Sequence, residues 1–201
     1  MKRILIAGIG NIFLGDDAFG VEVAQRLMQR PLPPAVRVID FGIRSYDLAY
    51  ALTDGYDVVI LIDAVSRGEA PGTVCLIKPD MDELPAPENG VGPELPDAHS
   101  LNPMRVLQLA RSLGGELPEA LVLVGCEPAV LATEQIGLSP LVHAAIPPAI
   151  ETIESLVAEL LDAPLTPAPV KAEVTATTAC SGESVGLGGL AATTGMESNA
   201  I

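Results

Sequence analysis

The sequence predicts an α/β fold built on a mixed, mostly parallel β-sheet. Short, continuously apolar runs alternate with segments of helical periodicity, which is typical of strands that are covered on both faces and joined by crossover helices. The connection over residues 64–71 is too short for a crossover helix, so one strand is expected to run antiparallel. With 49% hydrophobic and 18% charged residues, the chain can bury a sizeable core.

The first half of the chain is expected to supply three strands and two helices. Residues 2–8 contain an unbroken apolar run, and residues 17–30 carry apolar side chains at helical spacing until Pro31. Asp16 and Asp17 stand at the start of this helix, where carboxylates can cap free N–H groups. Strands are then predicted at residues 36–40 and 57–63, separated by a helix at residues 45–52 that Ser45 is expected to cap.

The second half is expected to complete the sheet and its helical layers. Residues 73–77 form the antiparallel strand, and residues 120–126, with the sequence ALVLVGC, form the last strand. Helices are predicted from Pro103 to about residue 113 and over residues 140–161. Residues 1–162 therefore form the predicted domain. Residues 163–201, rich in Ala, Thr, Gly, Ser and Pro, are expected to be a disordered tail.

Charge and cysteine content restrict the class of protein. The formal net charge is −15, and so acidic a surface disfavours nucleic acid and membrane surfaces as partners. No apolar run approaches the roughly 18 residues of a spanning helix, and the N-terminal run is too short for a signal peptide. Three widely spaced cysteines without a CxxC motif argue against a disulfide framework or a zinc–thiolate site. We therefore expect a cytoplasmic protein, and a monomer by default.

Three residues are predicted to meet at one edge of the sheet. In a sheet of order 2-1-3, ligands bind beyond the carboxyl ends of the first and third strands. Asp17 follows the first strand and Asp63 ends the third, while His99 lies in the long segment before residue 103. Two carboxylates and one imidazole form an O/O/N set that suits a divalent ion such as zinc or nickel.

Each candidate also has a simpler interpretation. Asp17 is explained by a place at a helix start, Asp63 by a bond to a loop amide, and His99 by a solvated loop. His143, inside the last helix, is expected to be a partly buried structural residue. The Gly8-Ile9-Gly10 sequence resembles a dinucleotide-binding loop, but Phe13 occupies the third glycine position and two acids would face the pyrophosphate.

The motifs of residues 1–160 resemble those of the nickel–iron hydrogenase maturation endopeptidases (peptidase family M52). The pattern GxGNxxxxD(D/E)xxG is matched by GIGNIFLGDDAFG, and the resemblance continues through VILIDAVSRGEAPGTV, LVLVGCEP and IGLSP. It implies a three-layer sandwich, phosphorylase/hydrolase-like, with a mixed five-stranded sheet flanked by helices. Carried over by motif, it implies Asp17, Asp63 and His99 as catalytic and metal-contacting residues, and Asp40 for substrate recognition.

The resemblance also implies the reaction. These proteases remove a C-terminal peptide from the large-subunit precursor of the hydrogenase once nickel is inserted, so nickel comes with the substrate; zinc or another divalent ion at the same site is the alternative. A metal-dependent and an aspartate-based mechanism both remain open. The alternative function is a non-catalytic, nickel-sensing, chaperone-like protein that binds the precursor. The sequence departs from the family at Phe41-Gly42-Ile43-Arg44, where many members have a Gly-Gly-Thr-like turn, and around His99, which precedes SLNP.

Overall fold

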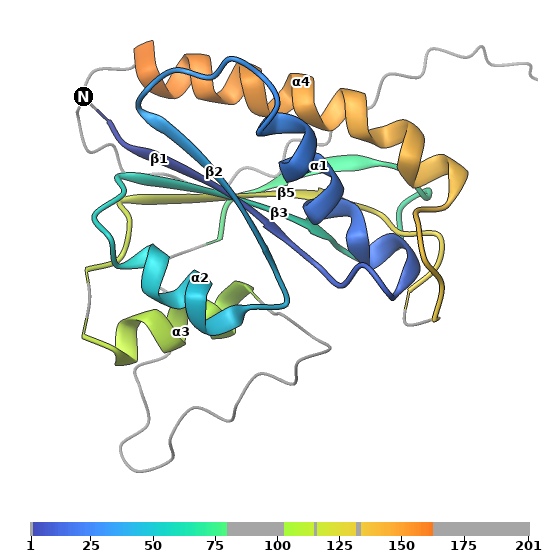
Figure 1. Cartoon of the computed structure of the whole chain (residues 1–201), viewed down its shortest axis with the longest axis horizontal. Coiled ribbons are helices and arrows are strands. Elements are labelled where there is room, and N and C mark those ends of the chain that lie inside the picture. Colours follow the sequence, from blue (N-terminus) through green and yellow to red (C-terminus); the bar gives the residue numbers. More distant parts are fainter. Residues whose placement is uncertain (1, 80–102, 115, 132–133, 163–201) are drawn as a thin grey trace, which may run out of the picture.

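The chain forms a three-layer α/β sandwich (Figure 1). The computed structural model describes residues 2–79, 103–114, 116–131 and 134–162. Its elements are, in chain order, β1 (Ile4–Ile9), the 3₁₀ turn η1 (Gly15–Ala18), α1 (Phe19–Leu27), β2 (Val36–Gly42), α2 (Ser45–Leu52), β3 (Val58–Ala64), β4 (Val74–Ile77), α3 (Pro103–Ser112), β5 (Ala120–Cys126) and α4 (Pro140–Asp162). The fold class predicted from the sequence is confirmed.

The sheet has five strands in the order β2-β1-β3-β5-β4. β1 runs parallel to both β2 and β3, and β3 runs parallel to β5. β4 pairs antiparallel with β5, as the short connection after β3 predicts. β1 and β3 are therefore neighbours, and the chain leaves their carboxyl ends in a common region of the molecule.

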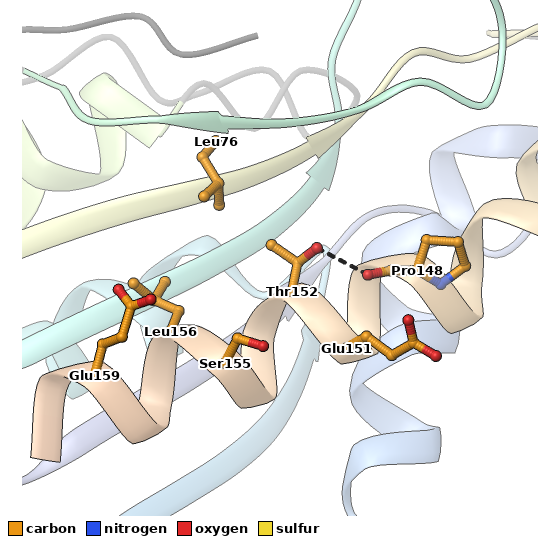
Figure 2. A pocket seen from close by; sticks show the side chains of 7 residues that line it. All are labelled: Leu76, Pro148, Glu151, Thr152, Ser155, Leu156 and Glu159. Atoms are coloured by element: carbon orange, nitrogen blue, oxygen red, sulfur yellow. Dashed lines mark hydrogen bonds between the residues drawn. The ribbon is translucent and has the colours of Figure 1, made fainter. Parts of the chain in front are cut away.

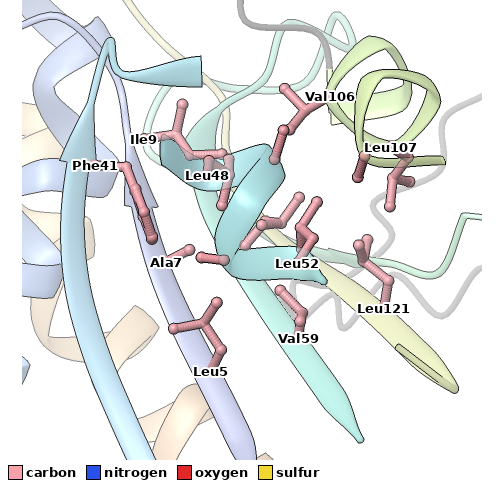
Figure 3. Close-up of a cluster of buried hydrophobic side chains, with 14 of the residues drawn as sticks. Leu5, Ala7, Ile9, Phe41, Leu48, Leu52, Val59, Val106, Leu107 and Leu121 are labelled. Carbon is pink, nitrogen blue, oxygen red and sulfur yellow. The ribbon is translucent and has the colours of Figure 1, made fainter. Parts of the chain in front are cut away.

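Two hydrophobic clusters fix the helical layers on the sheet. α1 and α4 cover one face and α2 and α3 the other (Figure 1). Because successive side chains of a strand point to opposite faces, Leu5 and Ala7 of β1 join the α2/α3 cluster while Ile4 and Ile6 join the α1/α4 cluster. Figure 3 shows the first of these clusters, with Leu48 and Leu52 of α2 packed over the strands.

One predicted helix start and one predicted helix cap are wrong, although the second helix has the predicted bounds, Ser45–Leu52. The first helix does not begin at Asp17: a 3₁₀ turn over Gly15–Ala18 comes first, and the α-helix begins at Phe19. In α2 the N-cap position is Arg44 rather than Ser45, and no side chain caps that helix end. Both errors come from assigning a capping role to a polar residue by its type, whereas the turn before each helix decides which residue enters it.

The last helix, α4, is long and apolar enough to cross a membrane by length and composition, contrary to the sequence-based expectation that no segment would be. Its apolar side chains instead form a stripe at helical spacing that packs against the sheet, as in a core helix. The buried members of this stripe are Val142, Ala145, Ile146, Ala149, Ile150, Ile153 and Val157. α4 ends at Asp162, and the tail over residues 163–201 lies outside the described residues, so the predicted domain boundary stays a prediction.

Candidate active site

Glycines bring the turn after β1 and the start of α1 against the ends of two strands. A Cβ at Gly10, whose φ is +133°, would lie 1.7 Å from the carbonyl oxygen of Asp17. A Cβ at Gly20, in the first turn of α1, would lie 2.0 Å from the carbonyl oxygen of Ile62 and 2.3 Å from that of Ile9. Only glycine permits these approaches. They place Asp17 beside the carboxyl end of β3.

Asp17 lies in the 3₁₀ turn η1, half-buried, with one carboxylate oxygen fixed by the backbone. Its Oδ2 accepts a hydrogen bond from the backbone N–H of Asn11 at 2.6 Å. Burial raises the pKa of the Asp17 carboxyl above its usual range, and the Asn11 N–H only partly opposes that shift. The Asp17 side chain therefore holds the turn that follows β1, by accepting the Asn11 N–H, and does not cap the following helix.

Asp63, near the end of β3, is 8% exposed. Its Oδ1 accepts a hydrogen bond from the backbone N–H of Ala64 at 2.9 Å. Burial raises its pKa well above the usual range, and the negative charge of Asp17 raises it further. Because η1 packs against β3, the two predicted carboxylates lie near each other, close enough for the charge of Asp17 to act on Asp63.

The arrangement of the two carboxylates favours a bound cation or the protonation of one of them. Within the described residues, no hydrogen bond reaches Oδ1 of Asp17 or Oδ2 of Asp63. Two carboxylates in one partly dry site repel each other, and a divalent ion or a single bound proton relieves that repulsion. The described part of the chain contains no group of three His, Cys, Asp or Glu side chains that could hold a metal ion. His99, the predicted third member, lies outside the described residues.

Asp16 has a different role, which the sequence analysis missed. Its side chain is fully buried and accepts three backbone hydrogen bonds from the loop between β5 and α4, namely from Ala129 at 2.8 Å, Val130 at 2.9 Å and Ser139 at 2.6 Å. Burial opposes ionisation, but these N–H groups outweigh it and lower the pKa of Asp16. The predicted capping of the adjacent helix is wrong, because the carboxylate anchors a distant loop. The sequence shows two adjacent aspartates, Asp16 and Asp17, but it does not indicate which of the two side chains bonds to a loop more than 100 residues away.

Asp40, the predicted recognition residue, borders a pocket of about 340 Å³ that adjoins the turn holding Asp17. Its Oδ2 accepts a hydrogen bond from Nε2 of Gln25 at 3.0 Å. Gly10 and Asn11, which belong to the turn that holds Asp17, also line this pocket. The remaining lining residues are Ile12, Phe13, Val21, Gln25, Phe41, Gly42, Ile43 and Arg44. The pocket thus extends from the candidate site toward the end of β2.

A larger pocket, of about 410 Å³, lies between β4 and α4 and is not suited to catalysis (Figure 2). Its carboxylates, on Glu151 and Glu159, are exposed and eight residues apart on one helix, which separates them by about 12 Å. Its one drawn hydrogen bond runs from Oγ1 of Thr152 to the carbonyl oxygen of Pro148 at 2.8 Å, within the helix. Such a groove holds no pair of groups that can act on one bond.

Two other interpretations of the sequence are settled by the geometry. His143 is exposed rather than partly buried, because it lies on the outer side of α4, where its Nε2 is 3.1 Å from a guanidinium nitrogen of Arg26. The backbone N–H of Asn11, which a bound phosphate would need, is already taken by Asp17. The glycine-rich turn therefore serves close packing and holds a carboxylate, which disfavours a dinucleotide site.

Comparisons with known proteins agree on one family. A model of the hydrogenase maturation protease family, HycI, matches residues 21–156. The chain is 37% identical to the hydrogenase 2 maturation protease of Escherichia coli over 75% of its own length and 88% of the relative's. It is 36% identical to a putative hydrogenase maturation protease of Methanocaldococcus jannaschii over 76% and 94% of the two chains. Among solved structures, the hydrogenase-maturating endopeptidase HybD of E. coli superposes with a TM-score of 0.62 at 33% identity, covering 79% of this chain and 94% of that one.

Proposed function

The chain belongs to the hydrogenase maturation protease family, and from that premise we propose that it is the endopeptidase that removes a C-terminal peptide from the nickel-loaded large-subunit precursor of a nickel–iron hydrogenase. Membership makes it a hydrolase. The relatives are named as maturation proteases, which gives no support to a non-catalytic chaperone-like role. We further propose that it works as a monomer in the cytoplasm.

The observation that carries this proposal is the pair of carboxylates, Asp17 and Asp63, at the junction of β1 and β3. Each has one oxygen held by a backbone N–H, so the other oxygen keeps a fixed direction. Carboxylate oxygens suit a divalent ion, and nickel also accepts imidazole nitrogen. In this proposal the nickel already bound in the precursor is part of the substrate, and Asp17, Asp63 and His99 contact it. Zinc or another divalent ion at the same three residues is the alternative.

Contact with the precursor's metal would position the scissile peptide bond. Holding two reactants in a fixed geometry removes much of the entropic barrier to reaction. Hydrolysis then needs a water molecule whose proton is taken by a base. A buried carboxyl with a raised pKa beside a second carboxyl matches the arrangement of an acid–base pair, with one member protonated and the other ionised. We assign the protonated role to Asp63 and the ionised role to Asp17. The alternative mechanism is attack by a water molecule that the metal polarises.

Asp40 is proposed to recognise the substrate. It borders the pocket that begins at the Asp17 turn, so a peptide bound across the site passes it. Its fixed contact with Gln25 holds the carboxylate in place at the pocket wall.

Mass spectrometry of the precursor tests the proposal. Wild-type protein incubated with nickel-loaded large-subunit precursor is expected to reduce the precursor's mass by one C-terminal peptide. Asp17→Asn keeps the size of the side chain but removes its charge, and is expected to slow that cleavage by about 100-fold or more. Asp54→Asn, at an exposed acid that follows α2, is the matched control and should cleave like wild type. An unchanged precursor mass with wild-type protein refutes the proposed function.

A further inference from the structure

Large apolar side chains are exposed next to the candidate site. Phe13 and Ile12, on the turn between β1 and η1, are 61% and 46% exposed, and Ile136 and Leu131, on the loop between β5 and α4, are 83% and 39% exposed. We call these four residues the apolar rim. Contiguous exposed apolar surface beside a functional site is typical of a binding surface.

The two halves of the apolar rim lie side by side although they are far apart in the sequence. The backbone N–H of Gln135 donates to the carbonyl oxygen of Phe13 at 3.1 Å, and Leu14 forms an isolated bridge with Gln135. The N–H of Asp16 donates to the carbonyl oxygen of Val130 at 3.2 Å. Ile136 and Leu131 directly follow these bonded residues, so both apolar pairs project from one joined backbone.

That backbone is held rigidly. The N–H of Phe13 donates to Oδ1 of Asn11 at 3.0 Å, and the N–H of Leu14 donates to the carbonyl oxygen of Asn11 at 3.1 Å. The buried carboxylate of Asp16 fixes the opposite loop through three N–H groups. Because this backbone is already fixed, binding costs little backbone conformational entropy, which favours affinity.

We propose that the apolar rim is the docking surface for the precursor polypeptide, where it binds apolar side chains that flank the scissile bond. This proposal rests on the proposed function. The rim is continuous with the site, because Asn11 both holds Asp17 and supports Phe13. Because the four rim side chains are apolar, the precursor side chains that contact them are expected to be apolar.

The occupant is the precursor rather than a second copy of this chain. A dimer formed through the rim would cover the turn that carries Asp17, and the substrate could then not reach the carboxylates. A precursor segment lying on the rim instead leads directly into the site.

A kinetic experiment separates docking from catalysis. The double variant Phe13→Ser/Ile136→Ser, in the full chain, is assayed with nickel-loaded precursor over a range of concentrations. We expect the half-saturating precursor concentration to rise at least about tenfold, with the rate at saturation within about twofold of wild type. The matched control is Tyr50→Ser on α2, which removes a ring of similar exposure, 57% against 61% for Phe13, and is expected to change neither value.

Three outcomes overturn the proposal. An unchanged half-saturating concentration shows that the rim does not bind the precursor, and a reduced saturated rate with unchanged half-saturation shows that the substitutions act on the site itself. A wild-type dimer in sedimentation that the double variant loses assigns the rim to a second copy. If the proposed function itself is wrong, the wild-type protein does not cleave the precursor. In that case the equilibrium binding of the precursor to the wild type and to the double variant still tests the apolar rim.

Discussion

At the scale of single residues, two buried aspartates, Asp16 and Asp63, differ in pKa because different groups surround them. Asp16 is buried among backbone N–H groups that stabilise its negative charge, and its pKa is lowered. Asp63 is buried with a single N–H and a second carboxylate nearby, and its pKa is raised. The first arrangement stabilises the fold, whereas the second costs stability and is typical of a functional site.

Asp63→Asn is expected to abolish cleavage while stabilising the fold. Asparagine keeps the size of the side chain but can neither donate a proton as an acid nor carry a charge. Because the pKa of Asp63 is higher in the folded state, ionisation destabilises that state, and wild-type stability falls as the pH rises above the unfolded value of about 3.9. The melting temperature of the variant should therefore exceed that of wild type at pH 7, by about 2–4 °C for each kcal/mol gained.

The pH series supplies the control for that prediction. The difference in melting temperature between Asp63→Asn and wild type should shrink as the pH falls below the unfolded value of about 3.9, because Asp63 is then protonated in both states. Wild-type rates of cleavage by the variant, or a lower melting temperature at pH 7, would remove Asp63 from the catalytic role assigned to it.

Asp16→Asn is expected to destabilise the protein by about 3 kcal/mol or more. The amide replaces an accepting oxygen by an NH₂ group that faces backbone N–H donors, and each buried donor left without an acceptor costs about 1–3 kcal/mol. The folded pKa of Asp16 is lowered, so its contribution is present above the unfolded value of about 3.9 and is lost as the pH falls through the folded value. Urea denaturation at pH 7 and at pH 3 measures both effects; equal stability of variant and wild type at pH 7 would contradict the anchoring role.

At the scale of elements, the site depends on how closely α1 approaches β1 and β3. The apolar pattern of residues 4–7 and 58–62 was enough to predict these strands, because a strand buried on both faces needs an unbroken apolar run. The close approach itself could not be predicted from spacing. A dinucleotide-binding loop would carry its third glycine at the position of Phe13, whereas the glycine that permits close packing here is Gly20, inside the helix.

Gly20→Ala tests that contact. In an ordinary helix interior this substitution stabilises by about 1 kcal/mol, because alanine has the higher helix propensity. Here the added Cβ would lie 2.0 Å from the Ile62 carbonyl oxygen and must push α1 away from β3. We expect a loss of about 1–3 kcal/mol in chemical denaturation, together with slower cleavage because Asp17 moves relative to Asp63. A stabilised variant with full activity would show that the helix tolerates displacement.

At the scale of the whole molecule, the neighbourhood of the first three strands was expected from the fold class, whereas the place of β5 between β3 and β4 was not predicted. Strand order 2-1-3 is one of the common orders of doubly wound α/β sheets, and the observed sheet contains it, with β1 between β2 and β3. The shared location of Asp17 and Asp63 could therefore be predicted, although the hydrogen bonds that orient them could not. His99 lies outside the described residues, so its part in the site stays a prediction.

The domain boundary can be tested with a chain that stops at residue 162. Both hydrophobic clusters of the described structure are built from residues 4–161, so this shortened chain should melt within about 2 °C of the full chain and cleave the precursor at the same rate. Thermal denaturation and the mass assay check the two expectations, with the full chain as control. A large loss of stability would place residues 163–201 within the folded domain.

In the proposed reaction, two carboxylates at the junction of β1 and β3 act on a precursor that already carries nickel. The most direct measurement is the rate of C-terminal cleavage of one precursor preparation, divided into nickel-loaded and nickel-free halves and incubated with the wild-type protein. The account predicts rapid loss of the C-terminal peptide from the nickel-loaded half and cleavage at least about 100-fold slower from the nickel-free half. Equal rates for the two halves would contradict it.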